Sequence, residues 1–319
     1  MFGKEAPLDV VTGGAGFMGS HLAEALLDRG RRVRIVDDLS SGDRANVPAG
    51  AEFMEGDVAQ LADRAFLNAE VVYHLAAIPS VSFSIEHPVE SQHSIVEATV
   101  AVLAAAEKAG VRRVVFASSC SVYGDARDMP RTELHEPDPL SPYALGKLCA
   151  EKFARYWASN GTLETVALRI FNVYGPRQDP LSAYAAVIPR FFDRLQAGRP
   201  LKIYGDGEQT RDFIYVADVV KGMADAGAPE RPVGSCYNIA SGRPTSILEL
   251  AHAMARVVDM GLLVDHRDPR PGDIRHSWAD ITRARTDLAF APSTSLEEGL
   301  RATLKWLGKR KLICAGADR

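Results

Sequence analysis

LDVVTGGAGFMGSHL, residues 8–22, joins a short apolar run to a glycine-rich turn and then to a helical pattern. Gly13, Gly16 and Gly19 give the turn the spacing G-x-x-G-x-x-G. Glycines are common in ordinary turns, so the motif gains its weight from the strand before it and the amphipathic helix after it. Such a turn lets the backbone approach a pyrophosphate, whose charge then meets the helix start at Phe17 and Met18. The stretch therefore predicts a dinucleotide site.

The first 175 residues alternate short apolar runs with longer amphipathic ones, as in a parallel sheet that helices cover on both faces. We expect strands at Leu8–Thr12, Arg32–Asp37, Ala51–Glu55, Val71–Ala76, Val114–Ser118 and Thr165–Ile170. We expect helices at Phe17–Arg29, Val89–Ala109 and Tyr143–Ser159. The predicted fold class is α/β, a Rossmann-type doubly wound parallel sheet.

The acidic pair Asp37-Asp38 closes the second expected strand. An acid about 20 residues after the first glycine accepts from the ribose hydroxyls of NAD and repels the 2′-phosphate of NADP. A turn or N-cap aspartate is the plain alternative, but the glycine turn already in place favours NAD. Asp57 and Val58, after the third strand, would lie near the adenine. The small residues of Leu75–Ala77, after the fourth, suit close passage of the cofactor.

The composition changes at about Val173, where glycine and proline become frequent and the expected elements become shorter. No stretch has the composition of a flexible linker. We therefore predict an NAD-binding domain over residues 1–175 and a smaller mixed α/β domain over residues 176–319. The second domain would hold mainly the substrate, with the chain crossing back to the first. We expect the residues from about Gly308 onward to fray.

Tyr143 and Lys147 lie four residues apart, on one face of an expected helix. A lysine ammonium beside a phenol lowers the pKa of that phenol from its usual value of about 10. Ser119 ends the fifth expected strand, and the carboxyl ends of such strands border the ligand cleft. A tyrosine–lysine pair alone occurs by chance, but its order after the glycine turn and the serine makes coincidence improbable. We expect the three side chains to converge beside a nicotinamide.

The composition excludes several other classes of protein. The chain has 319 residues and a net charge of −4, so no nucleic acid or anionic membrane is expected as a partner. No apolar run reaches the roughly 18 residues of a membrane span, and no signal-peptide pattern opens the sequence. Cys120, Cys149, Cys236 and Cys314 are scattered, which favours a cytoplasmic protein with no metal site and no disulfide framework.

With these motifs the sequence resembles the extended short-chain dehydrogenase/reductases of the NAD-dependent epimerase/dehydratase type, and most of all UDP-hexose 4-epimerases. The resemblance runs from Val10 to about Leu307. The matching stretches are the glycine turn, Asp37–Gly42, His74–Ala77, Ser118–Gly124, the Tyr143/Lys147 pair, Phe171–Pro180, Gly205–Gly207 through Arg211–Phe213, and Arg270–Asp273.

The resemblance implies roles for these residues. Tyr143 would be the general base on the sugar 4-hydroxyl, Ser119 would bond the same oxygen, and Lys147 would hold the nicotinamide ribose. Hydride would leave C4 for NAD and return to the other face of the keto sugar, so that the cofactor stays bound. Ser41 and Gly42 would add cofactor contacts.

The resemblance further implies a UDP-sugar substrate and a homodimer. The nucleotide diphosphate would contact Asn172, Arg211, Arg270 and Asp273, since arginines offer paired donors to phosphate. Ser80, Ser121 and Val187 are further expected substrate contacts.

Two positions bear on the substrate and the reaction. Ser277 stands where similar epimerases with a bulky tyrosine accept only unsubstituted hexoses, so it leaves room for an N-acetyl group without requiring one. Cys120-Ser121 stands where sugar-nucleotide 4,6-dehydratases resemble one another in carrying Asp-Glu, so dehydration lacks its acid and base. Cys120 itself is interpreted as a small inert thiol.

One departure and two alternatives stay open. Similar enzymes have an asparagine near the position of Ile95, for which His93 or Ser94 would have to substitute. A UDP-glucuronate 4-epimerase or decarboxylase would need a cation for the sugar carboxylate, for which Arg177 is available. A catalytically silent NAD-binding regulator is the alternative of another class, although it would not need Ser119, Tyr143 and Lys147.

Overall fold

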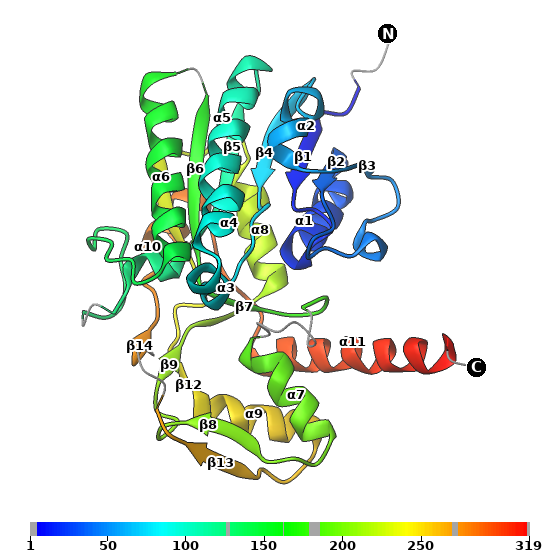
Figure 1. Cartoon of the computed structure of the whole chain (residues 1–319), viewed down its shortest axis with the longest axis vertical. Helices are drawn as coiled ribbons and strands as arrows, with labels where there is room; N and C mark the ends of the chain where they lie inside the picture. The colour runs from blue at the N-terminus through cyan, green and yellow to red at the C-terminus, as the bar shows by residue number, and fades with distance from the viewer. Residues whose placement is uncertain (1–4, 126–127, 162, 179–185, 270–273, 318–319) are drawn as a thin grey trace.

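The computed structural model describes residues 5–125, 128–161, 163–178, 186–269 and 274–317 (Figure 1). Its centre is a seven-stranded, fully parallel sheet in the order β11-β6-β5-β4-β1-β2-β3. The strands are β1 (Leu8–Thr12), β2 (Arg32–Asp37), β3 (Glu52–Glu55), β4 (Ala69–His74), β5 (Arg113–Ser119), β6 (Glu164–Ile170) and β11 (Ser235–Ile239). The strand order reverses between β1 and β4, which in such sheets marks the ligand cleft. The predicted Rossmann-type fold is confirmed.

Helices cover both faces of the sheet (Figure 1). One face holds α2 (Val58–Ala65), α5 (Ala98–Lys108) and α6 (Pro142–Asn160), and the other holds α1 (Phe17–Asp28), α8 (Val216–Ala226) and α10 (Thr282–Leu288). Because side chains alternate along a strand, Val10 of β1 packs into the first layer and Val11 into the second. Both residues are fully buried, which explains why the strand is apolar throughout.

A smaller lobe lies beyond the carboxyl ends of the strands (Figure 1). Its helices are α7 (Val187–Gln196), α9 (Ile247–Val258) and α11 (Leu296–Ala317), which share one apolar core with β8 (Leu201–Tyr204). Its other strands are β13 (Val264–Arg267), paired with β8, and β9 (Thr210–Arg211), paired with β12 (Thr245–Ser246) and β14 (His276–Ser277). β7 (Asn172–Tyr174) and β10 (Phe213–Tyr215) form a parallel pair of their own.

The expected helix over Val89–Ala109 is interrupted. The chain forms α3 (Val81–Glu86), α4 (Pro88–Gln92), a π-helical turn at His93–Glu97, and only then α5. The hydroxyl of Thr99 donates to the carbonyl of Ile95 at 2.5 Å, and Ile95 itself is buried against Phe116 and Ala150. π turns of this kind occur often at functional sites. His93 is exposed and pairs with Glu97, whereas Ser94 accepts a long bond from the Ile78 N–H at 3.5 Å.

The expected end of the chain is also different in the structure. α11 continues through Ala317, where we expected fraying from about Gly308. The segment contains no proline, and most of its residues favour helix, so nothing local stops it. Among the described residues, none of the helices has the length and apolar character needed to cross a membrane.

The amino ends of β5 and β6 carry an ion pair between a buried arginine and a partly exposed glutamate. The guanidinium of Arg113 is fully buried and donates to Glu164 at 2.8 Å. It also donates to the carbonyls of Ala226 and Ala228, at the end of α8, at 2.8 and 2.5 Å. Next to this pair, Arg31 makes a two-pronged contact with the buried Asp9, at 2.8 and 2.6 Å. Ion pairs therefore stabilise the sheet at the amino ends of its strands, whereas the carboxyl ends border the smaller lobe.

Candidate active site

The glycine turn lies at the carboxyl end of β1. Gly13 has φ +68°, and a Cβ there would lie 2.8 Å from the backbone nitrogen of Ala76. At Gly19 a Cβ would overlap the carbonyl oxygen of Gly13, so only a glycine lets α1 pack directly on the turn. The N-cap of α1 is Gly16, and no side chain of the described residues caps this helix. The first N–H groups of α1, at Phe17 and Met18, are thus left for a ligand, and the turn fits a dinucleotide pyrophosphate.

The two acids that follow β2 differ in environment. Asp37 is buried, and its carboxylate accepts from the N–H groups of Ala15 at 2.9 Å and Leu39 at 2.8 Å. Burial raises the pKa of Asp37, although these hydrogen bonds oppose the rise. Asp38 is exposed and accepts from the backbone and side chain of Ser40. Asp37 is therefore the acid that is fixed against the glycine turn.

The other predicted cofactor contacts lie around the same edge. Gly42 lies against Asp37 and Ala15, next to Ser41. Asp57 caps α2 by accepting from the Ala59 N–H at 2.8 Å, and Val58 is buried. The segment 75–77 follows β4 and passes directly over Gly13, as its contact with Ala76 shows. The expected β4 end at Ala76 is two residues too late, because the N–H groups of Leu75 and Ala76 donate to the Thr12 hydroxyl.

Buried His74 contacts Thr12, the residue whose hydroxyl holds Leu75 and Ala76. Its Nδ1 lies 2.8 Å from the hydroxyl of Thr12, and its Nε2 lies 3.2 Å from that of Thr99. The Thr99 hydroxyl already donates to Ile95, so it accepts from Nε2–H, and Nδ1 accepts from Thr12. Burial lowers the pKa of His74 to about 3, with Lys147 adding to the effect. The ring is therefore neutral.

Ser119, Tyr143 and Lys147 converge at the carboxyl end of β5. The Ser119 side chain hydrogen-bonds Tyr143, and its oxygen also accepts from the Ser121 hydroxyl at 3.0 Å. Lys147 is 4% exposed and donates to the carbonyl of Ala117 at 2.9 Å. Its ammonium lies 5.9 Å from the centre of the Tyr143 ring. The structure thus brings together the three side chains that the sequence analysis selected.

The sequence analysis expected Lys147 to lower the pKa of the Tyr143 phenol, and for the chain by itself this expectation is wrong. Burial raises the pKa of Tyr143 to about 12, and the hydrogen bond from Ser119 opposes the rise without cancelling it. Burial likewise lowers the pKa of Lys147 to about 8, opposed by attraction to Glu151. Desolvation disfavours the charged form of either group, and here it is the largest influence on both pKa values.

Three of the predicted substrate residues are placed together by backbone pairing. Arg211 of β9 pairs with Ser277 of β14, and the Asn172 N–H donates to the carbonyl of Asp212 at 3.0 Å. The charge of Arg211 also acts on the Cys120 thiol, next to Ser119. The side-chain oxygen of Asn172 is buried and has no hydrogen-bond partner within the described part of the chain. Arg211 and Ser277 therefore lie side by side, and Arg211 is close enough to Cys120, next to Ser119, for its charge to act there.

Buried Asp212 holds this arrangement. Its carboxylate accepts from the N–H groups of Ser241 at 2.7 Å, Gly242 at 3.0 Å and Ala279 at 3.3 Å, and from the Ser241 hydroxyl at 2.6 Å. The backbone of Arg131, in the loop after Ser119, is bonded on both sides to the strand of Ser277 through Trp278 and Asp280. Main-chain hydrogen bonds therefore tie the strand of Ser277 to the loop that follows Ser119.

The remaining predicted substrate residues that the structure describes lie at the starts of helices. Ser80 caps α3 by accepting from the Phe83 N–H at 3.1 Å, and Val187 is the half-buried first residue of α7. Arg270 and Asp273 lie outside the described residues. The cation named for a uronate, Arg177, donates to Glu24 of α1 at 2.5 Å, so it is already paired.

Two features of the site were missed in the sequence. Glu151 and Arg169 form a buried ion pair beneath Lys147. In addition, Ser84 accepts from the Tyr143 N–H at 3.0 Å, and Gln92 donates to the Pro142 carbonyl at 2.8 Å. An arginine inside the otherwise apolar run of β6 was a usable signal for the first. No local pattern pointed to the second, because it depends on how α3 and α4 meet α6.

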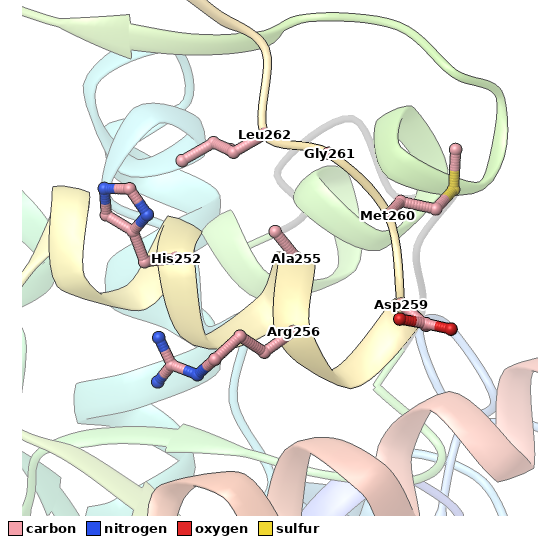
Figure 2. Close-up of a pocket in the computed structure, with 7 residues that line it drawn as sticks. All are labelled: His252, Ala255, Arg256, Asp259, Met260, Gly261 and Leu262. Carbon is pink, nitrogen blue, oxygen red and sulfur yellow. The ribbon is translucent and has the colours of Figure 1, made fainter.

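A surface hollow of about 520 Å³ lies elsewhere, at the end of α9 in the smaller lobe (Figure 2). It is lined by His252, Ala255, Arg256 and the loop 259–262. It contains none of the predicted site residues, so it is not the active site.

Comparison with known proteins agrees with this geometry. The family model "NAD dependent epimerase/dehydratase family" matches residues 10–240. A UDP-glucose 4-epimerase of Mycolicibacterium smegmatis is 40% identical over 307 residues, which cover 93% of this chain and 97% of that protein. The chain therefore belongs to the NAD-dependent epimerase/dehydratase family, and the predicted family membership is confirmed.

Two solved structures extend the similarity over nearly the whole fold. A UDP-N-acetylglucosamine 4-epimerase of Methanobrevibacter ruminantium, in complex with UDP-N-acetylmuramic acid, has a TM-score of 0.92 and 36% identity, and covers 96% of this chain and 99% of that one. A UDP-glucose 4-epimerase of Thermus thermophilus, in complex with NAD, has a TM-score of 0.87 and 34% identity, and covers 94% and 99%. The dinucleotide expected from Asp37 is thus the one that the family description names.

Proposed function

We propose that this chain is an isomerase, an NAD-dependent 4-epimerase of UDP-hexoses that acts through a transient 4-keto sugar. The observation that carries the proposal is the meeting of Ser119, Tyr143 and Lys147 beside a glycine turn that fits a dinucleotide. UDP-glucose and UDP-galactose are the first candidate substrates, and their N-acetylhexosamine counterparts are the second. The named relatives, two of them UDP-glucose 4-epimerases and one a UDP-N-acetylglucosamine 4-epimerase, support both.

The cofactor would lie along the carboxyl ends of β1, β2 and β4. The residues that would hold it are Gly13, Gly16, Phe17, Met18, Asp37, Asp38, Ser41, Gly42, Asp57, Val58, Leu75, Ala76, Ala77, Tyr143 and Lys147. Bound NAD supplies reversible hydride acceptance at the sugar C4. Since the hydride comes back in the same turnover, the reaction needs no external reductant.

The chain's own groups would manage the proton and the orientation. In its ionised form Tyr143 would take the proton of the sugar 4-hydroxyl and later return one, because its phenol is the titratable group bonded to Ser119. Ser119 donates to the same sugar oxygen, and Ser121 bonds Ser119 from the other side. Buried Lys147 contributes a positive charge 5.9 Å from the centre of the Tyr143 ring, which favours the phenolate against the burial that opposes it.

The nucleotide half of the substrate would lie against the smaller lobe. Arg211 and Asn172 are proposed for the diphosphate, with Arg270 and Asp273 added from the sequence and Ser80 and Val187 as flanking contacts. Ser277 leaves space beside the sugar.

A division into a domain of residues 1–175 and one of residues 176–319 is supported by the separate core of the smaller lobe. The chain returns at α8 and β11 to pack on the first domain.

The direct test of the function is a panel of UDP-sugars followed by NMR. We expect the purified chain to interconvert UDP-glucose and UDP-galactose, or their N-acetyl forms, with no reductant added. A UDP-glucuronate sample tests the uronate alternative, for which the pairing of Arg177 with Glu24 gives no support. Absence of any epimer with every UDP-hexose would overturn the proposal and leave the silent NAD-binding regulator.

We also infer that the chain forms a homodimer. α6 presents Leu145, Phe153 and Tyr156 to solvent at 53%, 37% and 61% exposure, on one helix face, and neighbouring Val89 of α4 is 81% exposed. An apolar face of this kind on two adjacent helices is typical of a surface that a second copy covers.

The three described cysteines are free thiols, in keeping with the predicted cytoplasmic location.

A charge in this face should separate the two copies. We expect light scattering on the eluting protein to give twice the 34.5 kDa mass of one chain, and Phe153→Asp to give the monomer. Leu67→Asp, at a 55% exposed leucine away from α6, is the matched control and should stay dimeric. A wild-type monomer at all concentrations would contradict the inference.

A further inference from the structure

An ion pair is buried directly beneath the catalytic side chains. Glu151 of α6 is 8% exposed and Arg169 of β6 is 5% exposed. The Arg169 guanidinium donates to the two carboxylate oxygens of Glu151 at 3.0 and 2.8 Å. A buried pair with this two-pronged geometry is fixed in place, because breaking it would leave an uncompensated charge out of water.

The pair is connected to the catalytic groups on two sides. Glu151 follows Lys147 by four residues, so the two side chains share a face of α6. The hydroxyl of Ser118, the residue before Ser119, donates to Glu151 at 2.5 Å. Ser118 is also the direct partner of Arg169 in the β5–β6 register. The carboxylate of Glu151 therefore joins the catalytic helix to the strand that carries Ser119.

The charges around Lys147 do not balance. Its ammonium donates to the neutral Ala117 carbonyl, and within the described ranges no carboxylate lies at ion-pair distance from it. The titratable groups that act on it or lie against it are His74 of β4 and Tyr143 and Glu151 of α6, while Arg169 of β6 and Cys236 of β11 act on Glu151. His74 is neutral, and burial keeps the phenol and the thiol protonated. Two cations thus share one anion.

We propose that Glu151 is a positioning residue whose carboxylate, held by Arg169 and Ser118, keeps the buried ammonium of Lys147 charged, while Arg169 limits how far it does so. The catalytic meaning of this charge rests on the proposed function, but the electrostatic claim does not. Burial lowers the pKa of Lys147 to about 8 even though the attraction of Glu151 opposes the fall. Without that carboxylate, Lys147 would lose its charge within the working pH range.

The proposal predicts opposite signs for the two members of the pair. Glu151→Gln removes the anion and should lower the pKa of Lys147 by about one unit, since an opposite charge nearby shifts a pKa by roughly 1–3 units. Arg169→Met removes a repelling cation and should raise it. The double variant removes one charge of each sign and should return the pKa toward the wild-type value. A merely structural role would give no such pattern of signs.

The measurement is an NMR titration of protein labelled with ¹³C at the lysine Cε. The Lys147 signal is assigned by its loss in Lys147→Met. Glu164→Gln is the matched control, because it removes the charge of the Arg113–Glu164 pair, which lies on the same two strands at their other ends. We expect the control to lower stability and to leave the Lys147 titration unchanged.

Each outcome is decisive. If Glu151→Gln leaves the pKa of Lys147 unchanged, or if both single variants shift it in the same direction, the proposal fails. Should Glu151→Gln not fold, Arg169→Met and the double variant still test the sign. The alkaline limb of the kcat–pH profile should move in parallel, downward for Glu151→Gln and upward for Arg169→Met. The titration requires no substrate, so an absence of epimerase activity would overturn the proposed function and leave this inference to be judged separately.

Discussion

Tyr143→Phe is expected to lower kcat by about 10²- to 10⁴-fold, the usual contribution of a positioned general acid–base group. The substitution removes only the phenol oxygen, which is bonded to Ser119 and is the group available to take the sugar proton. The ring and its packing against Lys147 remain, so we expect binding of NAD to change little. The measurement is turnover of the best UDP-hexose by NMR, with bound NAD quantified in the same preparation.

Tyr156→Phe provides the matched control, since it makes the same chemical change on the same helix. Tyr156 is 61% exposed and lies about three and a half turns further along α6. Its kcat should stay close to that of the wild type. Near-normal turnover in Tyr143→Phe would show that another group is the base.

Gly19→Ala is expected to weaken NAD binding by about 10- to 100-fold, together with a lower melting temperature. A methyl group at this position would overlap the carbonyl of Gly13, and both sides of the contact are main chain. α1 can relieve the overlap only by moving away from the turn, at the 1–3 kcal/mol typical of overpacking. Each 1.4 kcal/mol taken from binding is a factor of ten in affinity. Equilibrium dialysis with NAD and thermal unfolding measure the two effects.

Gly261→Ala controls for the loss of a glycine as such. A Cβ at Gly261, in the loop that borders the hollow of Figure 2, meets no atom within 4 Å. This variant should bind NAD as the wild type does. If Gly19→Ala also binds normally, the turn does not hold the cofactor in the way we propose.

Local signals were enough to predict most of the fold. β1 and β2 begin and end where expected, because each is a short apolar run bounded by glycine or aspartate. The glycine turn and the Tyr143/Lys147 pair are local patterns as well, and the sheet brings them to the same edge. The position of Ser119 followed from the rule that strand ends face the cleft.

What escaped prediction depends on contacts between distant segments. The π-helical turn at His93–Glu97 is accompanied by the hydrogen bonds of Thr99 to Ile95 and His74, which no periodicity in the helix reveals. The Glu151–Arg169 pair joins a helix to a strand 18 residues away. The pKa of Tyr143 was misjudged for the same reason, because spacing shows its neighbours but not the burial that dominates it.

In this parallel sheet, the amino ends of the strands serve stability and the carboxyl ends serve binding and catalysis. The Arg113–Glu164 and Arg31–Asp9 pairs fasten the amino ends of the strands, whereas the carboxyl ends carry the groups that must bind and react. Active sites often give up stability for function. In this molecule the groups that serve function lie at the carboxyl ends of the strands. Substitutions meant to raise stability are therefore best placed at the amino ends. There, improved packing can compensate for later changes of substrate range without disturbing the chemistry.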